Sequence, residues 1–99
     1  MSRREDTGVS INERWQMANS LNADLFISVH VNSSGGTGVE TIIPTGSLGL
    51  LRFTKMTAVY PELAFIDNPA HNPDVDILRF RRQEMAQALS DGIQAFLSQ

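Results

Sequence analysis

The sequence lacks the features that assign many chains to a class at first sight. It has no cysteine, which excludes disulfides and thiolate metal sites, and cysteine usage therefore gives no information about its compartment. No apolar run approaches the length needed to cross a membrane, and the first residues lack the apolar segment of a signal peptide. The net charge is −3, so there is no basic surplus that would indicate a nucleic-acid partner.

What is present fits one small globular domain. The chain has 99 residues, of which 41% are hydrophobic and 19% charged, as is ordinary for a soluble domain. A chain of this length buries a core with only a thin margin of stability. We therefore predict a single domain over residues 1–99.

An apolar stretch at residues 25–33 is the centre of the predicted organisation. Three of its residues are β-branched: Ile27, Val29 and Val31. Such a run is typical of a strand buried on both faces. His30 and Asn32 would share one face at its carboxyl end, where open α/β sheets bind ligands. A histidine there is either a metal ligand or a hydrogen-bonded core or rim residue, and the pattern leaves both open.

Helices are predicted near both ends of the chain. Ser10 and Glu13 fit a capping box, and apolar residues then recur at helical spacing, which predicts a helix over residues 10–21. A long helix is predicted from near residues 73–76 to about residue 97. Gly92 lies inside it, and since a helical glycine costs ~1 kcal/mol relative to alanine, we expect it to allow close packing on the sheet.

Two further strands are predicted at residues 39–43 and 58–60, the second ended or moved to a sheet edge by Pro61. The link between residues 25–33 and 39–43 has about six residues, too few for a parallel crossover, so these strands would pair antiparallel if they pair. Residues 45–55 give no clear pattern. The predicted fold class is α/β, a small mixed sheet flanked by helices.

Four segments match, in order, the signatures of one family. Residues 3–19 resemble Arg-x-x-Asp followed by Leu-x-x-Arg-x-x-x-Ala-Asn, and residues 23–33 resemble Ala-Asp-x-x-Ile-Ser-x-His-x-Asn. Residues 38–41 resemble Gly-x-Glu-Thr, and residues 62–68 resemble Glu-x-Gly/Ala-Phe-Ile-x-Asn. Together they resemble the type 3 family of zinc-dependent N-acetylmuramoyl-L-alanine amidases, found in bacterial cell-wall hydrolases and phage endolysins.

The resemblance implies a shortened version of the family's phosphorylase/hydrolase-like fold. It also implies a hydrolase that cleaves the amide between N-acetylmuramic acid and L-alanine in peptidoglycan. In the family two His and one Glu hold a zinc ion, leaving a position for water, and a second Glu moves protons. By position, His30 matches a zinc ligand and Glu62 matches the catalytic glutamate. Asn32 and Glu40 are candidate substrate-binding residues.

The chain departs from the family in two places. The family's other His and Glu ligands lie upstream of the Arg-x-x-Asp signature, which begins here at residue 3, and a helix with its connection is absent after Ile43. We therefore expect an amidase domain truncated at its N-terminus and internally shortened, without two of the three zinc ligands. His71 is the only other histidine. It is either an exposed loop residue or the one imidazole that could substitute in the metal site.

Several residues also have simpler interpretations. Glu62 would then be a loop carboxylate, and Glu40 is best interpreted as a strand-edge carboxylate that is not a ligand. Trp15 is expected in the core, and Arg14 and Asp6 in structural polar contacts. The glycine-rich residues 33–38 are no phosphate-binding loop, because no lysine follows and a strand comes next.

Three hypotheses about function remain open: an active amidase, a non-catalytic remnant that binds peptidoglycan or a partner, and a piece of a longer enzyme. The family implies an extracytoplasmic location at the cell wall, with a phage-encoded lysin as a second origin. A sheet lacking an edge strand would expose unpaired backbone groups. We therefore also expect self-association.

Overall fold

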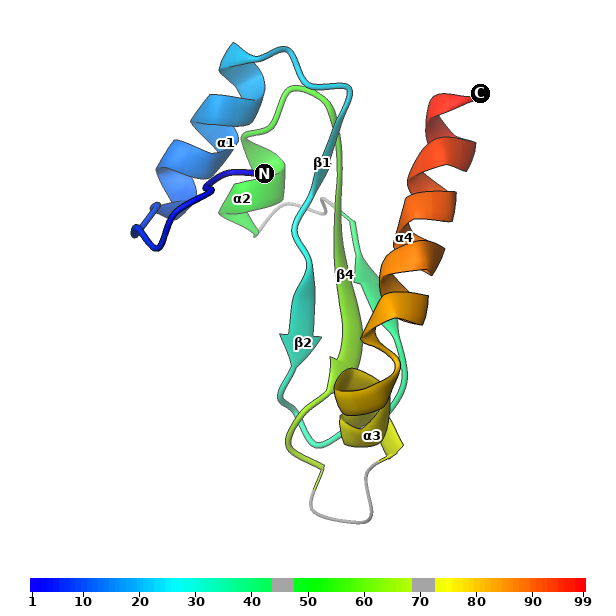
Figure 1. The fold of residues 1–99 in the computed structure, drawn as a ribbon. Helices are drawn as coiled ribbons and strands as arrows, with labels where there is room; N and C mark the ends of the chain where they lie inside the picture. The colour runs from blue at the N-terminus through cyan, green and yellow to red at the C-terminus, as the bar shows by residue number, and fades with distance from the viewer. Residues whose placement is uncertain (44–47, 69–72) are drawn as a thin grey trace. The chain divides into compact units, whose positions relative to one another are not determined.

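The computed structural model describes residues 1–43, 48–68 and 73–99, and its fold is α/β as predicted (Figure 1). The chain divides into two compact units, Met1–Ser28 with Ile42–Tyr60, and Val29–Thr41 with Pro61–Gln99. The elements in chain order are α1 (Ile11–Ser20), β1 (Leu25–Ile27), β2 (His30–Asn32), β3 (Glu40–Ile42), α2 (Gly49–Arg52), β4 (Thr57–Phe65), α3 (Pro73–Phe80) and α4 (Arg82–Leu97).

Strand β4 is the strand with which the three other described strands pair. β1 pairs in parallel with its first part, with Ile27 opposite Val59, and β2 pairs in parallel with its second part, with His30 opposite Glu62. β3 also pairs with β4. The strand predicted over residues 25–33 is therefore two short strands, and the central position belongs to β4.

The prediction that residues 25–33 are buried on both faces is wrong. Residues of β1 are half-buried, whereas His30 and Val31 of β2 are exposed. The reason is that, in the part of the chain that the structure describes, β2 pairs with β4 alone and forms one end of the path β1-β4-β2. A strand with one paired neighbour keeps its outer side open to solvent.

Pro61 does not end its strand, contrary to the prediction. It lies inside β4 and is buried. The ladder with β1 reaches as far as Val59, whose carbonyl accepts from Ser28 N–H at 3.0 Å, and the ladder with β2 begins at Glu62. Proline lacks a backbone N–H, and it stands between the last register pair with β1 and the first register pair with β2.

Helix α1 begins as the sequence predicts. The Glu13 N–H donates to the Ser10 hydroxyl at 3.2 Å, and the Ser10 N–H donates to the Glu13 carboxylate at 2.7 Å, which completes a capping box. Hydrogen bonding to Ser10 also holds the pKa of Glu13 below its ordinary value. The apolar positions are less buried than expected, because Ala18 is the one buried residue of the helix and Ile11 is exposed.

A short helix that the sequence did not predict, α2, packs beside α1 in the first unit (Figure 1). Its Leu50 and Leu51 are buried. The side chain of Asn19 joins the two segments, because it donates to the Phe53 carbonyl at 2.9 Å and accepts from the Lys55 N–H at 2.8 Å. The helix went unpredicted because four residues are too few to show a helical period.

Trp15 and Phe53 form the aromatic contact of this helix pair, with ring centroids 5.4 Å apart. Trp15 is half-buried, so its expected place in the core is only partly correct.

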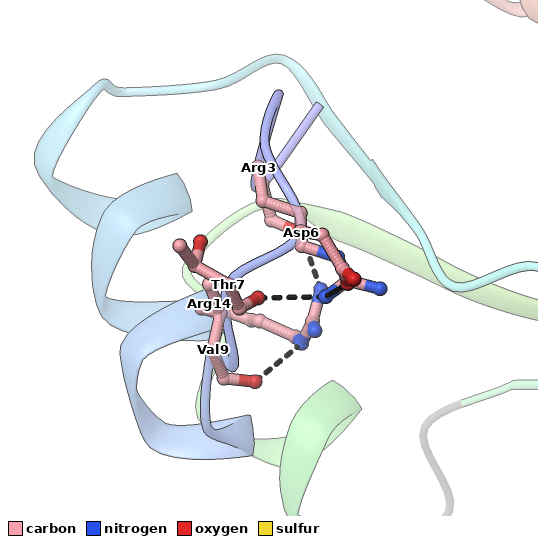
Figure 2. A network of polar contacts seen from close by, with 6 residues as sticks. Arg3, Asp6, Thr7, Val9 and Arg14 are labelled. Carbon is pink, nitrogen blue, oxygen red and sulfur yellow. Dashed lines mark hydrogen bonds and ion pairs between the residues drawn. The ribbon is translucent and has the colours of Figure 1, made fainter.

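The expected polar contacts near the N-terminus are present (Figure 2). Arg14 donates through Nε to the Val9 carbonyl at 3.1 Å. Arg3 donates to the Thr7 carbonyl at 2.6 Å and lies 3.7 Å from the carboxylate of Asp6. Arg14 and Asp6 therefore take part in polar contacts of the segment before α1, as predicted.

The predicted C-terminal helix is two helices, α3 and α4. The backbone leaves the helical region at Arg81, with φ −121° and ψ 25°, and Arg81 pairs with Glu84 in the first turn of α4. The apolar spacing continues across this break, so the sequence pattern could not show it. No helix in the described ranges is long and apolar enough to span a membrane.

Gly92 does not pack closely on the sheet, contrary to the prediction. A Cβ built on it would have no heavy atom within 4 Å outside the helix backbone and its chain neighbours, and α4 has no buried residue. Gly92 therefore lowers the stability of α4 relative to alanine, and no close packing compensates for this loss.

We expect Gly92→Ala to stabilise the chain by ~1 kcal/mol, because alanine lowers the backbone entropy of the unfolded state and meets open space here. Urea unfolding followed by circular dichroism measures the change. The reciprocal Ala88→Gly, at an exposed position of the same helix, should destabilise by a similar amount. A loss of stability in Gly92→Ala would contradict the open surroundings of this residue.

Candidate functional site

The two residues predicted to carry the chemistry lie opposite each other in the second unit. His30 of β2 and Glu62 of β4 are register partners in the parallel pair. Neighbouring strands are roughly 4.8 Å apart, and register partners project from the same face of the sheet. The fold therefore brings together the predicted ligand and the predicted catalytic glutamate, although they are far apart in the sequence.

The strand pairing is irregular immediately after this point. Asn32 is opposite Phe65, so β4 advances one residue more than β2 between the two register pairs. The Ile66 N–H then donates to the Asn32 carbonyl at 2.9 Å, which closes the pairing. Such bulges are common next to active sites, because they redirect a side chain without breaking the sheet.

Glu62 is the unusual group of the site. The residue is 8% exposed, and its Oε2 atom is buried with no hydrogen-bond partner in the described part of the chain. Buried carboxylate oxygens nearly always have a partner, because leaving one unsatisfied costs about 1–3 kcal/mol. An acceptor kept in this state is suited to receive a proton or a cation from a ligand. The interpretation of Glu62 as a plain loop carboxylate is wrong, since it lies within β4.

The two candidate substrate-binding residues also lie together. Asn32 donates from Nδ2 to the Glu40 carboxylate at 3.1 Å, and its Oδ1 accepts from the Ser33 N–H at 2.8 Å. Glu40 is the exposed first residue of β3, which agrees with a strand-edge carboxylate. The contact fixes the two side chains relative to each other, and their role towards a substrate stays a prediction.

The glycine-rich loop 33–38 is held by residues that sequence reasoning did not single out. Asp67 accepts from the Gly35 N–H at 3.0 Å, and Asn68 donates to the carbonyls of Gly35 and Gly36 at 3.0 and 3.1 Å. Asp74 accepts from the Gly38 N–H at 2.8 Å. Two backbone N–H groups that a phosphate would need, those of Gly35 and Gly38, are therefore already bonded to carboxylates. This agrees with the prediction that residues 33–38 are not a phosphate-binding loop.

The donor set does not complete a zinc site within the described residues. Across residues 1–43, 48–68 and 73–99, no three His, Cys, Asp or Glu side chains are grouped so as to hold a metal ion. His71, the predicted substitute, lies outside the described residues. Protein zinc sites use at least three such ligands, so His30 by itself does not fit one.

Comparison with known proteins gives a family for the first half of the chain. A sequence profile described as N-acetylmuramoyl-L-alanine amidase matches residues 1–48. The sporulation-specific N-acetylmuramoyl-L-alanine amidase of Bacillus subtilis (strain 168) is 54% identical over 43 residues, which are 43% of this chain and 17% of the relative. The resemblance seen in the sequence motifs is therefore confirmed over this part of the chain.

Two further relatives extend the similarity. The amidase CwlM of Bacillus licheniformis is 32% identical over 98 residues, covering 69% of this chain and 39% of the relative. The amidase LytC of Bacillus subtilis (strain 168) is 28% identical over 126 residues, covering 93% of this chain and 25% of the relative. No solved structure gives a significant match.

The alignments cover only a part of each relative. The chain spans less than two fifths of each relative's length, from 17% to 39%. The alignment with LytC covers 126 residues although the chain has 99, so that relative carries internal residues with no counterpart here. This supports the predicted internal shortening.

We expect Glu62→Met to stabilise the chain by about 1–3 kcal/mol, because it removes a buried acceptor without a partner and keeps the side-chain length. Chemical unfolding measures the difference. Glu5→Met is the matched control, since the same change at an exposed carboxylate should stay within about 0.5 kcal/mol of the parent. A clear destabilisation by Glu62→Met would mean that Oε2 has a partner in solution.

Proposed function

Taking the family match over residues 1–48 as the premise, we propose that the chain is part of a peptidoglycan hydrolase that cleaves the amide between N-acetylmuramic acid and L-alanine. Three relatives that carry the name of this activity support the proposal. The observation that carries it is the pairing of His30, the first residue of β2, with the buried, unsatisfied Glu62 of β4.

Amide hydrolysis requires a proton acceptor for the attacking water and a proton donor for the leaving nitrogen. Glu62 suits both tasks in turn, because its buried Oε2 has no competing hydrogen bond in the described residues and a carboxylate that takes a proton can return it. Asn32 and Glu40, which are hydrogen-bonded to each other, are the proposed hydrogen-bonding groups for the sugar or the peptide of the substrate. These roles are part of the proposal.

Zinc is the proposed cofactor of the complete site, with His30 as one ligand. A bound zinc ion would polarise the amide carbonyl and acidify a water molecule. Since the described residues supply no group of three ligands, the ion needs ligands in addition to His30.

A second candidate is a non-catalytic module that binds peptidoglycan or a partner protein. The absence of a three-ligand group in the described ranges favours it. The two candidates share a wall-facing site and differ in turnover. For both we propose a location at the cell wall, outside the cytoplasm, with bacterial and phage-encoded origins equally compatible with the family.

We expect the purified chain to bind zinc in a calorimetric titration if it is the amidase, and His30→Ala to weaken that binding at least about tenfold, because it removes a direct ligand. The same preparations are assayed for amino groups released from purified peptidoglycan. His71→Ala is the control variant, since a loss there would identify the substitute ligand. Peptidoglycan binding without zinc binding and without hydrolysis would contradict the amidase and support the binding module.

We also propose self-association through the edge formed by β3. Its residues Glu40–Ile42 are all exposed, and the neighbouring Val39 and Ile43 are 69% and 58% exposed. Apolar edge strands pair readily with a second copy. Light scattering should give about twice the 10.9 kDa of one chain, and Ile43→Lys should return the single-chain mass. A monomer at all concentrations would exclude this association.

A further inference from the structure

We propose that Asp74 is a positioning residue of the candidate site. Its carboxylate joins the glycine-rich loop 33–38 to the carboxyl end of β4 and thereby fixes the segments that bear His30, Asn32 and Glu62. The joining itself is independent of the proposed function, and only its effect on the reaction rests on that function.

The first observation is the hydrogen bonding of Asp74. The residue is 5% exposed at the start of α3, and its Oδ2 accepts from the Gly38 N–H at 2.8 Å and the Phe65 N–H at 3.0 Å. Burying a carboxylate is costly unless hydrogen bonds compensate, and bonds to a charged acceptor are about twice as strong as neutral ones. One oxygen atom therefore ties together two segments that are distant in the sequence.

The second observation is the close approach of the loop to β4. A Cβ on Gly36 would lie 2.8 Å from the aromatic ring of Phe65, so a larger residue there would require the loop or the ring to shift. Asp67 and Asn68, which follow β4, are hydrogen-bonded to Gly35 and Gly36. The position of the loop is thus set by the end of β4 and by α3.

These contacts reach the candidate site through the backbone. The loop starts directly after Asn32, and Gly38 lies two residues before Glu40, so holding the loop at both ends favours the contact between these two side chains. Phe65 is the register partner of Asn32, three residues after Glu62. By holding Phe65, Asp74 also supports the register in which Glu62 lies opposite His30.

Asp76 offers a matched control. It is also an acidic residue in the first turn of α3, but it is exposed. Both carboxylates interact with the positive end of the helix dipole and contribute the same net charge. A difference between Asp74→Asn and Asp76→Asn therefore reports the hydrogen bonds of Asp74.

The experiment compares the two variants by NMR of isotope-labelled 99-residue chain. In Asp74→Asn we expect hydrogen exchange at Gly38 and Phe65 to be at least tenfold faster, and the imidazole signals of His30 and the amide signals of Asn32 to shift. Asp76→Asn should match the parent. Unchanged exchange and unchanged His30 and Asn32 signals in folded Asp74→Asn would overturn the proposal, because a residue that only stabilises the fold would not move these side-chain signals.

A measurement on the parent chain covers the case in which Asp74→Asn does not fold. Gly38 is exposed and lies in a glycine-rich loop, so its amide would exchange at nearly the random-coil rate unless a carboxylate holds it. We expect exchange at least about a hundredfold slower than that rate. Exchange at the random-coil rate would overturn the proposal without any variant.

The effect on the reaction is measured separately. If the parent hydrolyses peptidoglycan, Asp74→Asn should lower kcat/KM about tenfold or more under conditions where it is folded, because small displacements of reacting groups are costly. A parent without hydrolysis would count against the proposed function alone, since the exchange and side-chain signals are read without substrate. A fully active Asp74→Asn would overturn the positioning role.

Discussion

The parallel pairing of β2 with the second part of β4 is the constraint on which the candidate site depends. It places His30 opposite Glu62. Side chains alternate along a strand, so a shift of one residue would turn the predicted ligand away from the predicted proton acceptor. After this point the register changes by one residue at the bulge before Asn32, and hydrogen bonds hold the glycine-rich loop that follows.

Glu62 shows how the site and the stability of the chain oppose each other. An oxygen buried without a hydrogen bond lowers the stability of a domain that has little to spare. Proteins keep such groups where a reaction or a ligand uses them, and replacing them commonly stabilises the fold while removing the function. The unsatisfied carboxylate is therefore a physical reason, separate from the sequence motif, for proposing Glu62 as a functional group.

Local signals in the sequence predicted much of the fold. The capping box of Ser10 and Glu13, the fold class and the presence of strands at 25–33 and 39–43 followed from periodicity and turn residues. The division between β1 and β2 and the break at Arg81 could not be predicted, because the apolar pattern is continuous across both. Pro61 misled the prediction, since its cost depends on partners that only the folded sheet supplies.

The candidate site was predictable in its residues but not in its geometry. His30, Glu62, Asn32 and Glu40 came from motif positions, and the structure brings them together in pairs. Asp74 was not predicted as a site residue. Its hydrogen bonds are to backbone groups far away in the sequence, and such contacts give no periodic sequence pattern.

The place of Pro61 in β4 has a consequence for how the sheet assembles. It divides the strand into two docking segments, because a partner that slides across it meets a residue that cannot donate a hydrogen bond. β2 therefore cannot slip towards the first part of β4 without losing a bond, and β1 meets the same barrier from the other direction. Pro61 thus favours one register for each of the two short strands, β1 on the first part of β4 and β2 on the second part.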